Sequence, residues 1–211
     1  MKIGIIGATG HVGQAVTQEA LNRGHEVTAL VHNAARAQET FGDKVTVVAK
    51  DALALTADDL ASLDVVVDAF ASPKVYQHLD LAAHLVSLFR GDDKKRLVFV
   101  IGSSTLRNDK GEVLLDETLK RFAGEPWIAA PIQQGHEFQF LQWVDDVNWT
   151  VISPSTDFVD GPKTDYKTGN NTVITSADGK TEVNMGNFAA AMLDEIEQPK
   201  HNHEQFDVVN A

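Results

Sequence analysis

Short apolar runs rich in valine and isoleucine recur along the chain, with amphipathic stretches between them. A run that is apolar on both sides is typical of a parallel strand covered by helices on both faces. The pattern predicts strands at Ile3–Ile6, Val27–Val31, Val45–Val48, Val65–Val67, Leu97–Ile101, Thr150–Ile152 and Phe206–Val209. Helices are expected at about residues 11–23, 34–41, 57–62, 75–90 and 126–145, and at Asn187–Glu197. This alternation indicates right-handed βαβ units in a doubly wound parallel sheet of the α/β class.

Two long segments, residues 102–125 and 154–186, break this pattern because they are polar and rich in glycine and proline. Long irregular segments in a compact domain are usually binding loops, so we expect a loop-built cap there. Helix boundaries are marked by Gly24, which suits a left-handed cap after the first helix, and by Pro126, which suits a first helical turn.

Charge argues against nucleic acid as a partner. The 211 residues carry 18 Lys and Arg against 30 Asp and Glu, a net charge of −12, with 43% hydrophobic residues. A surface that acidic repels nucleic acid and anionic lipid. The acidic excess lies almost entirely after residue 50, so the first part of the chain would repel a polyanionic ligand least.

The chain contains no cysteine, which excludes disulfides, thiolate metal sites and a cysteine nucleophile and fits a reducing compartment. The first residues are only briefly apolar, so we expect no signal peptide. No apolar run approaches the ~20 residues that span a bilayer. The pair His201 and His203 lacks a third ligand nearby, so no metal site is expected. We expect a cytoplasmic protein with no membrane partner.

The turn between the first strand and the first helix reads Gly-Ala-Thr-Gly-His-Val-Gly. Gly7 would leave the strand in a tight turn, Gly10 would let a diphosphate approach the backbone, and Gly13 would let the helix pack close to the strand. Free amides at the helix start would then face the phosphates. The sequence therefore predicts a Rossmann-type dinucleotide site, and its candidate phosphate-binding residues also include Thr9, His11 and Val12.

The end of the second predicted strand bears on the choice of dinucleotide. An NAD site usually has a carboxylate there, whereas residues 30–36 contain none. Arg36, with His32 and Asn33, would attract a 2′-phosphate. We expect NADP as the preferred cofactor and NAD as the alternative; Arg36 could equally be a solvated residue of the following helix.

Several motifs together resemble the extended or atypical short-chain dehydrogenase/reductase superfamily. They are the turn Gly7–Gly13, Asp51 after the third strand, Ala69–Pro73 after the fourth and Val100–Ser104 after the fifth. The compact size and Trp149–Ser155 resemble the NmrA-like branch. The whole chain is similar to small bacterial proteins described as NADH-flavin reductases, related to biliverdin-IXβ/flavin reductase.

The resemblance implies roles for residues at the strand ends. Asp51 and Ala52 would approach the adenine, and Ser103 would lie near the nicotinamide and the substrate. The nicotinamide-side ribose and the carboxamide would be contacted by Ala69, Phe70, Ala71 and Pro154. Asp51 could instead cap a loop, and Ser103 could satisfy turn amides.

The tyrosine and lysine that alcohol-oxidising members of the superfamily use for proton transfer are absent. Neither Tyr76 nor Tyr166 has lysine four positions on, and the corresponding helix positions are Ala130 and Gln134. A ketone reduced by hydride becomes an alkoxide that needs an acid, whereas a reduced flavin or quinone is a weakly basic anion that water can protonate. An enzyme for such acceptors needs chiefly to hold the two rings together.

We therefore expect an NAD(P)H-dependent reductase of free flavin or a quinone, with flavin as substrate rather than prosthetic group. Ser103 and Gln134 are the candidate catalytic residues. Other acceptor contacts could come from Gln133, His136, Trp127 or Phe158. A non-catalytic, NAD(P)-sensing regulator of NmrA-like type fits the missing pair equally well, and a nucleotide-sugar epimerase fits less well.

We expect a single NAD(P)-binding domain over residues 1–211, as a monomer or homodimer. Residues 1–105 would form the cofactor-binding core, and residues 106–211 would add the remaining sheet, the substrate loops and the C-terminal helix.

Overall fold

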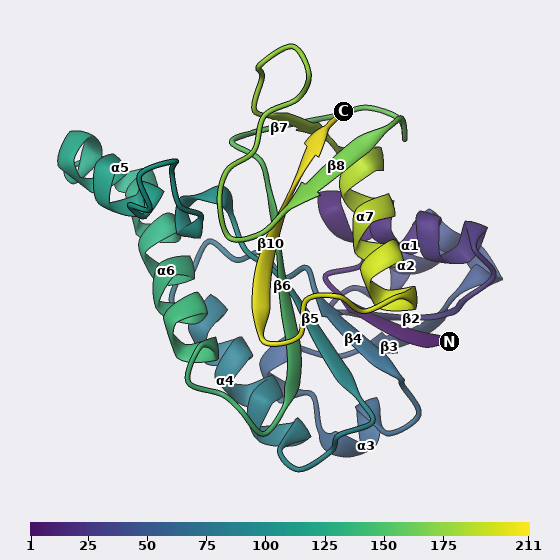
Figure 1. Cartoon of the computed structure of the whole chain (residues 1–211). Coiled ribbons are helices and arrows are strands. Elements are labelled where there is room, and N and C mark those ends of the chain that lie inside the picture. The colour runs from purple at the N-terminus through teal and green to yellow at the C-terminus, as the bar shows by residue number, and fades with distance from the viewer.

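A computed structural model covers residues 1–211 and has one eight-stranded sheet at its centre (Figure 1). The strand order is β3-β2-β1-β4-β5-β6-β10-β8, and only the edge strand β8 is antiparallel to its neighbour. These strands are β1 Lys2–Ile6, β2 Glu26–Val31, β3 Thr46–Ala49, β4 Val65–Asp68, β5 Arg96–Val100, β6 Asn148–Pro154, β8 Tyr166–Gly169 and β10 Glu204–Asn210. A separate two-stranded sheet pairs β7 Asp157–Val159 with β9 Glu182–Asn184. The reversal of strand order between β1 and β4 is the topological switch of a doubly wound fold.

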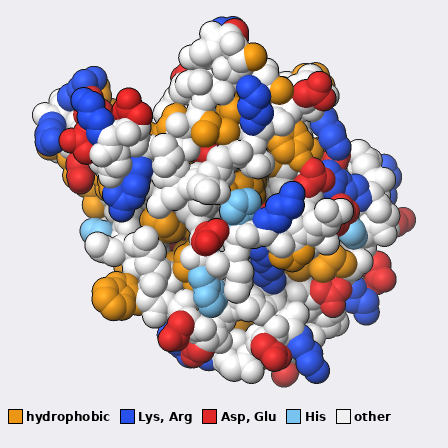
Figure 2. Space-filling model, in the orientation of Figure 1, with side chains coloured by type: hydrophobic (Ala, Val, Ile, Leu, Met, Phe, Trp, Pro, Cys, Tyr) orange, Lys and Arg blue, Asp and Glu red, His pale blue; other side chains and the backbone are white.

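Helices cover both faces of the sheet (Figure 1). One face carries α1 His11–Asn22, α2 Ala34–Phe41 and α7 Met185–Glu197. The other carries α3 Ala57–Leu60, α4 Gln77–Phe89 and α6 Ala129–Leu141. Helix α5, Leu114–Phe122, projects from the body and buries no residue of its own; Figure 2 shows basic and acidic side chains mixed on this projecting lobe.

Each face has its own apolar core. The core under α1, α2 and α7 contains 23 buried residues, and the core under α3, α4 and α6 contains 20. Alternate residues of one strand enter different cores: Val65 and Val67 the first, Val66 the second. This explains why the strands are apolar without alternation.

The expected strands and helices are confirmed, with shifts at their ends. Gly24 follows α1 with a positive φ of 80°. Pro126 opens a 3₁₀ turn, Pro126–Ile128, and α6 begins directly after it, so the helix expected at residues 126–145 consists of these two elements. The expectation that residues 102–125 and 154–186 are irregular is wrong in part. The first segment contains α5, whose charges match its helix dipole, and the second contains β7, β8 and β9.

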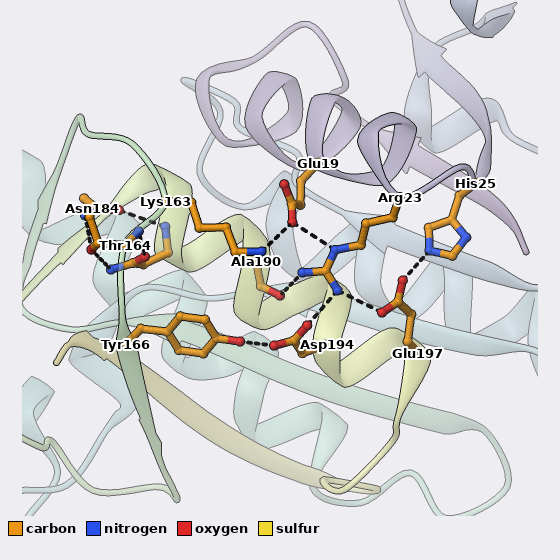
Figure 3. Close-up of polar contacts among 11 residues, drawn as sticks. Glu19, Arg23, His25, Lys163, Thr164, Tyr166, Asn184, Ala190, Asp194 and Glu197 are labelled. Atoms are coloured by element: carbon orange, nitrogen blue, oxygen red, sulfur yellow. Dashed lines mark hydrogen bonds and ion pairs between the residues drawn. The ribbon is translucent and has the colours of Figure 1, made fainter.

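An ionic network fastens α1 to α7 (Figure 3). Arg23 donates hydrogen bonds to Asp194 at 2.6 Å and Glu197 at 2.8 Å, and Tyr166 bonds Asp194. At the other side of the network Lys163 pairs with Glu19 at 3.1 Å. The helix that begins at the glycine turn is thereby held at its far end. No helix has both the length and the apolar character needed to cross a membrane.

Candidate nucleotide site

A groove of about 380 Å³ opens at the carboxyl ends of β1, β2, β3 and β4. In an open parallel sheet this edge, next to the topological switch, is where ligands bind. Ten of the residues expected to contact the cofactor line it: Gly7, Thr9, Gly10, His32, Arg36, Asp51, Ala52, Ala69, Phe70 and Ala71. Four others, His11, Val12, Gly13 and Asn33, lie in the chain beside it but outside its lining.

The glycine turn is close-packed, most severely at Gly7 and Gly13. Gly7 has a φ of 73°, and a Cβ there would lie 2.6 Å from the carbonyl oxygen of Ala69. A Cβ at Gly13 would overlap the carbonyl oxygen of Gly7. These two glycines are therefore needed by the protein itself. Gly10 has an ordinary φ of −77°, but a Cβ there would lie 3.1 Å from the carbonyl oxygen of Gly7, a tight contact, and Gly10 also lines the groove.

The start of α1 has no internal partner for its first amides. Gly10 is the N-cap, no side chain caps the helix, and no acidic residue lies in its first turn. The positive end of the helix dipole and its free N–H groups therefore favour an anion here. His11 holds Asp160 at 2.5 Å across this end, and both side chains are largely exposed.

Two basic side chains line the groove, and they differ in their pairing. Arg36 lines it and has no ion-pair partner, whereas Lys50 pairs with Asp59 at 2.6 Å. Asn33 caps α2 by accepting from the Arg36 amide at 3.0 Å, which fixes where the arginine leaves the helix. Asp51 accepts from the Leu53 amide at 2.9 Å, so it caps a loop while also lining the groove.

Three expected residues lie at the same edge of the sheet but outside the groove lining. Ser103 begins a 3₁₀ turn after β5, and Pro154 ends β6. Gln134 of α6 uses its Oε1 to accept from the Gly102 amide at 3.2 Å. Gln134 thus fastens α6 to the end of β5.

The expected acceptor contacts are scattered. His136 lines a separate pocket of about 390 Å³ beside α5, and Phe158 packs on Phe188 with ring centroids 4.9 Å apart. Trp127 lies against Phe122 at 5.4 Å, and both are exposed. The structure therefore brings together the cofactor candidates but gathers no acceptor pocket from these residues.

The sequence interpretation missed several residues of the groove. Lys50, Ser72, Pro73 and Gln77 also line it. The signal for Lys50 was available, because it follows β3 directly and the carboxyl ends of parallel strands share one edge. No such sequence signal pointed to Gln77. It lines the groove from α4, and its Oε1 accepts a hydrogen bond from the Ser72 hydroxyl at 2.6 Å.

Asp68, next to the groove-lining residues Ala69–Ala71, and Glu137 of α6 are buried carboxyl groups. Asp68 ends β4, directly before Ala69, and accepts from the Phe70 amide at 3.0 Å. Burial raises the pKa of Asp68 to about 7, against the opposing effect of that hydrogen bond. Burial, and then the charge of Asp68, raises the pKa of Glu137 on α6 well above its ordinary value. Neither carboxyl group has a cationic partner.

Comparison with known proteins identifies a family. A family model described as NAD(P)H-binding matches residues 7–199. The uncharacterised protein YwnB of Bacillus subtilis is 36% identical over all of this chain and 99% of its own. A proposed NADH-flavin reductase from Streptococcus pneumoniae is 30% identical over both whole chains, with a TM-score of 0.89. A proposed epimerase from Bacteroides thetaiotaomicron is 29% identical over 99% of this chain and 96% of its own, with a TM-score of 0.81.

Proposed function

The chain belongs to the NAD(P)H-binding family of oxidoreductases, as its resemblance to the atypical short-chain dehydrogenase/reductases predicted, and from that premise we propose that it reduces free flavin or a quinone by direct hydride transfer. The observation that carries this proposal is the groove itself. It combines an uncapped helix end for the diphosphate with an apolar wall, Ala69–Ala71, for the nicotinamide side. Location in the cytoplasm and a monomer or homodimer stay predictions.

The acceptor class is argued from proton chemistry. Gln134 is engaged by the Gly102 amide, and Ala130 has no proton to give, so α6 offers no acid at the two positions that would serve a ketone. Flavin and quinone accept hydride as delocalised systems and need no positioned acid. The same argument disfavours epimerase chemistry, although one similar structure is described as an epimerase.

The cofactor we propose is NADPH in preference to NADH. Arg36 lines the groove and has no ion-pair partner, and a 2′-phosphate would supply one. A charge-assisted hydrogen bond of this kind is worth roughly 1.5–3 kcal/mol, or about tenfold to a hundredfold in affinity.

The test is an acceptor screen with both nucleotides. We expect NADPH oxidation that depends on added FMN, riboflavin or a quinone, and none with a nucleotide-sugar. Gly10→Asp should abolish nucleotide binding, because it puts a carboxylate where the diphosphate would lie. Gly124→Asp is the control for the added charge, since that glycine has open space around it and an ordinary backbone conformation.

Arg36→Met should raise the KM for NADPH about tenfold or more and leave the KM for NADH unchanged; Arg90→Met, at the other end of the sheet, should change neither. Tight binding of both oxidised and reduced nucleotide, without turnover on any acceptor, would instead establish the sensor. Epimerisation of a nucleotide-sugar would contradict the acceptor class.

A further inference from the structure

Helix α5 carries an apolar stripe that the rest of the chain leaves largely uncovered. None of its residues is buried, although Leu115, Leu119 and Phe122 recur at the spacing that places side chains on one side of a helix. Phe122 is 43% exposed and lies against Trp127, which is 52% exposed, with the ring centroids 5.4 Å apart. Two large aromatic side chains in water on a projecting helical lobe mark a contact surface (Figure 1).

A pocket lies at the start of the same helix. It has a volume of about 390 Å³ and lies between α5 and α6, where Val113, Leu115 and Phe138 line it together with polar side chains. Gly135 of α6 also lines it, and a Cβ there would lie 2.9 Å from Leu115 Cδ2, so the two helices approach closely at this point. One end of α5 therefore offers a hollow, and the other end offers the exposed ring of Phe122.

The charges of α5 are distributed so that the helix complements itself. Its first turn contains Asp116 and Glu117, and its last turn contains Lys120 and Arg121. The i,i+4 spacing places Asp116 and Lys120 on one flank of the apolar stripe, and Glu117 and Arg121 on the other. A second α5 running antiparallel would set its basic end against the acidic end of the first on both flanks, with the two helix dipoles opposed. A parallel pair would set like charges against each other.

Within one chain these charges are only partly used. Glu117 and Arg121 pair at 2.6 Å, with side chains 51% and 66% exposed, and Asp116 and Lys120 form no ion pair. All four charges are on the outside of the lobe, where Figure 2 shows both signs. Because each chain has a net charge of −12, two copies repel each other overall, and they can associate only where their surfaces are locally complementary.

We propose that α5 is the contact between two copies of this chain, which pack their α5 helices antiparallel about a two-fold axis. In such an interface, residue i of one copy meets residue j of the other, and the reverse. One register serves the whole helix: Glu117 faces the partner's Arg121, and Phe122 faces the partner's Leu115, at the edge of the partner's pocket. The second copy thereby covers the aromatic side chains of each lobe and occupies its pocket.

The dimer should be weak. A nine-residue helix is only roughly 13 Å long, so the interface is smaller than that of stable complexes. We expect a dissociation constant on the order of 10–100 μM. Association through α5 goes beyond the proposed reductase activity and does not depend on it, so it is measured on the whole protein without nucleotide.

The first measurement is sedimentation velocity at protein concentrations from well below to well above that range. The wild type should pass from monomer to dimer. Phe122→Ala removes an exposed ring that its own chain does not need for folding, and it should weaken the dimer at least tenfold. Trp143→Ala is the matched control, because Trp143 is 86% exposed beyond the end of α6 and does not line the pocket. A wild type that stays monomeric, or a Phe122→Ala variant that dimerises equally well, would overturn the proposal.

The second measurement tests the antiparallel orientation. Glu117→Arg and Arg121→Glu each set like charges against each other in a dimer of identical copies, and each should weaken it by about tenfold or more. When the two variants are mixed, opposite charges meet again at both positions, so a mixed dimer should form with an affinity within about threefold of the wild type.

A double variant guards against a melted helix. Glu117→Arg combined with Arg121→Glu in one chain restores the i,i+4 pair as well as the contacts between copies, and should dimerise like the wild type. If neither the mixture nor the double variant dimerises, the two α5 helices do not pack antiparallel and the proposal is wrong.

Discussion

Two buried acidic sites in this molecule have opposite electrostatics. Near the amino ends of the strands, Glu195 of α7 binds Arg96 at 2.5 Å and His201 at 2.8 Å, with further backbone amides around it. Burial opposes its ionisation, but these hydrogen bonds lower the pKa of Glu195 to about 2. At the carboxyl ends, Asp68 and Glu137 have no cation, and burial raises the pKa of both.

The opposite pKa shifts follow from the groups that surround each carboxyl group and not from how deeply it is buried. Glu195 and Glu137 are almost equally buried, at 4% and 3% exposure. A permanently charged, fully bonded carboxylate holds α7 to β5 at every physiological pH. A carboxyl group that must keep a proton can respond to pH, and it lies at the edge of the sheet where the groove opens.

The largest effect is expected from breaking the paired site. Arg96→Met would leave Glu195 charged and buried without its guanidinium partner, and should lower the free energy of unfolding by about 3–5 kcal/mol. Chemical denaturation at neutral pH measures this loss. Arg90→Met, which breaks the exposed pair with Asp146, is the matched control and should cost under about 1 kcal/mol. Similar losses in both variants would contradict the contrast between buried and exposed pairs.

The two sites should also respond to pH in opposite directions. Because the folded pKa of Asp68 is raised from 3.8 to about 7, its stabilisation is complete below pH 4 and is lost as the pH rises through 7. The folded pKa of Glu195 is lowered from 4.5 to about 2, so its stabilisation is present above pH 4.5 and is lost as the pH falls through 2. One titrating proton changes stability by at most about 1.4 kcal/mol per pH unit.

Asp68→Asn should therefore flatten the decline of stability between pH 5 and 7 and leave the acid limb unchanged. Thermal or urea unfolding across the pH range measures both limbs. Asp207, another buried acid, has a pKa raised to about 6 and should leave part of the neutral decline in place. An unaltered decline in Asp68→Asn would show that Asp68 does not carry it.

A third variant addresses the unpaired site. Glu137→Leu replaces an unpartnered buried carboxyl group with an apolar side chain in an apolar core and should raise the free energy of unfolding by roughly 1–3 kcal/mol at alkaline pH. Urea unfolding at that pH, compared with Glu117→Leu on the exposed face of α5, measures the gain. If Glu137→Leu is less stable than the wild type, the carboxyl group of Glu137 must make stabilising contacts that the structure does not show.

Much of this comparison could not be read from the sequence. The strands were predictable because Val and Ile fill both of their faces, and the glycine turn was predictable because close packing restricts Gly7 and Gly13. Whether Glu137 faces the core depends on the rotation of α6 about its axis, and that helix has no strong apolar stripe to reveal it. Which groups surround Glu137 further depends on how α6 packs against the sheet, which local patterning does not encode.

The smallest effect is expected where both partners are solvated, and it sets the scale for the other predictions. Glu117 and Arg121 form an i,i+4 pair at 2.6 Å on α5, with both side chains more than half exposed. Glu117→Gln should lower the free energy of unfolding by about 0.3–0.5 kcal/mol, because water screens the pair and the helix retains its other contacts. Raising the salt concentration should remove most of that difference, whereas the loss in Arg96→Met should survive it, since the Glu195 site is closed to ions. A Glu117→Gln effect as large as that of Arg96→Met would mean that the projecting helix is stabilised by charge to a degree that its exposure does not account for.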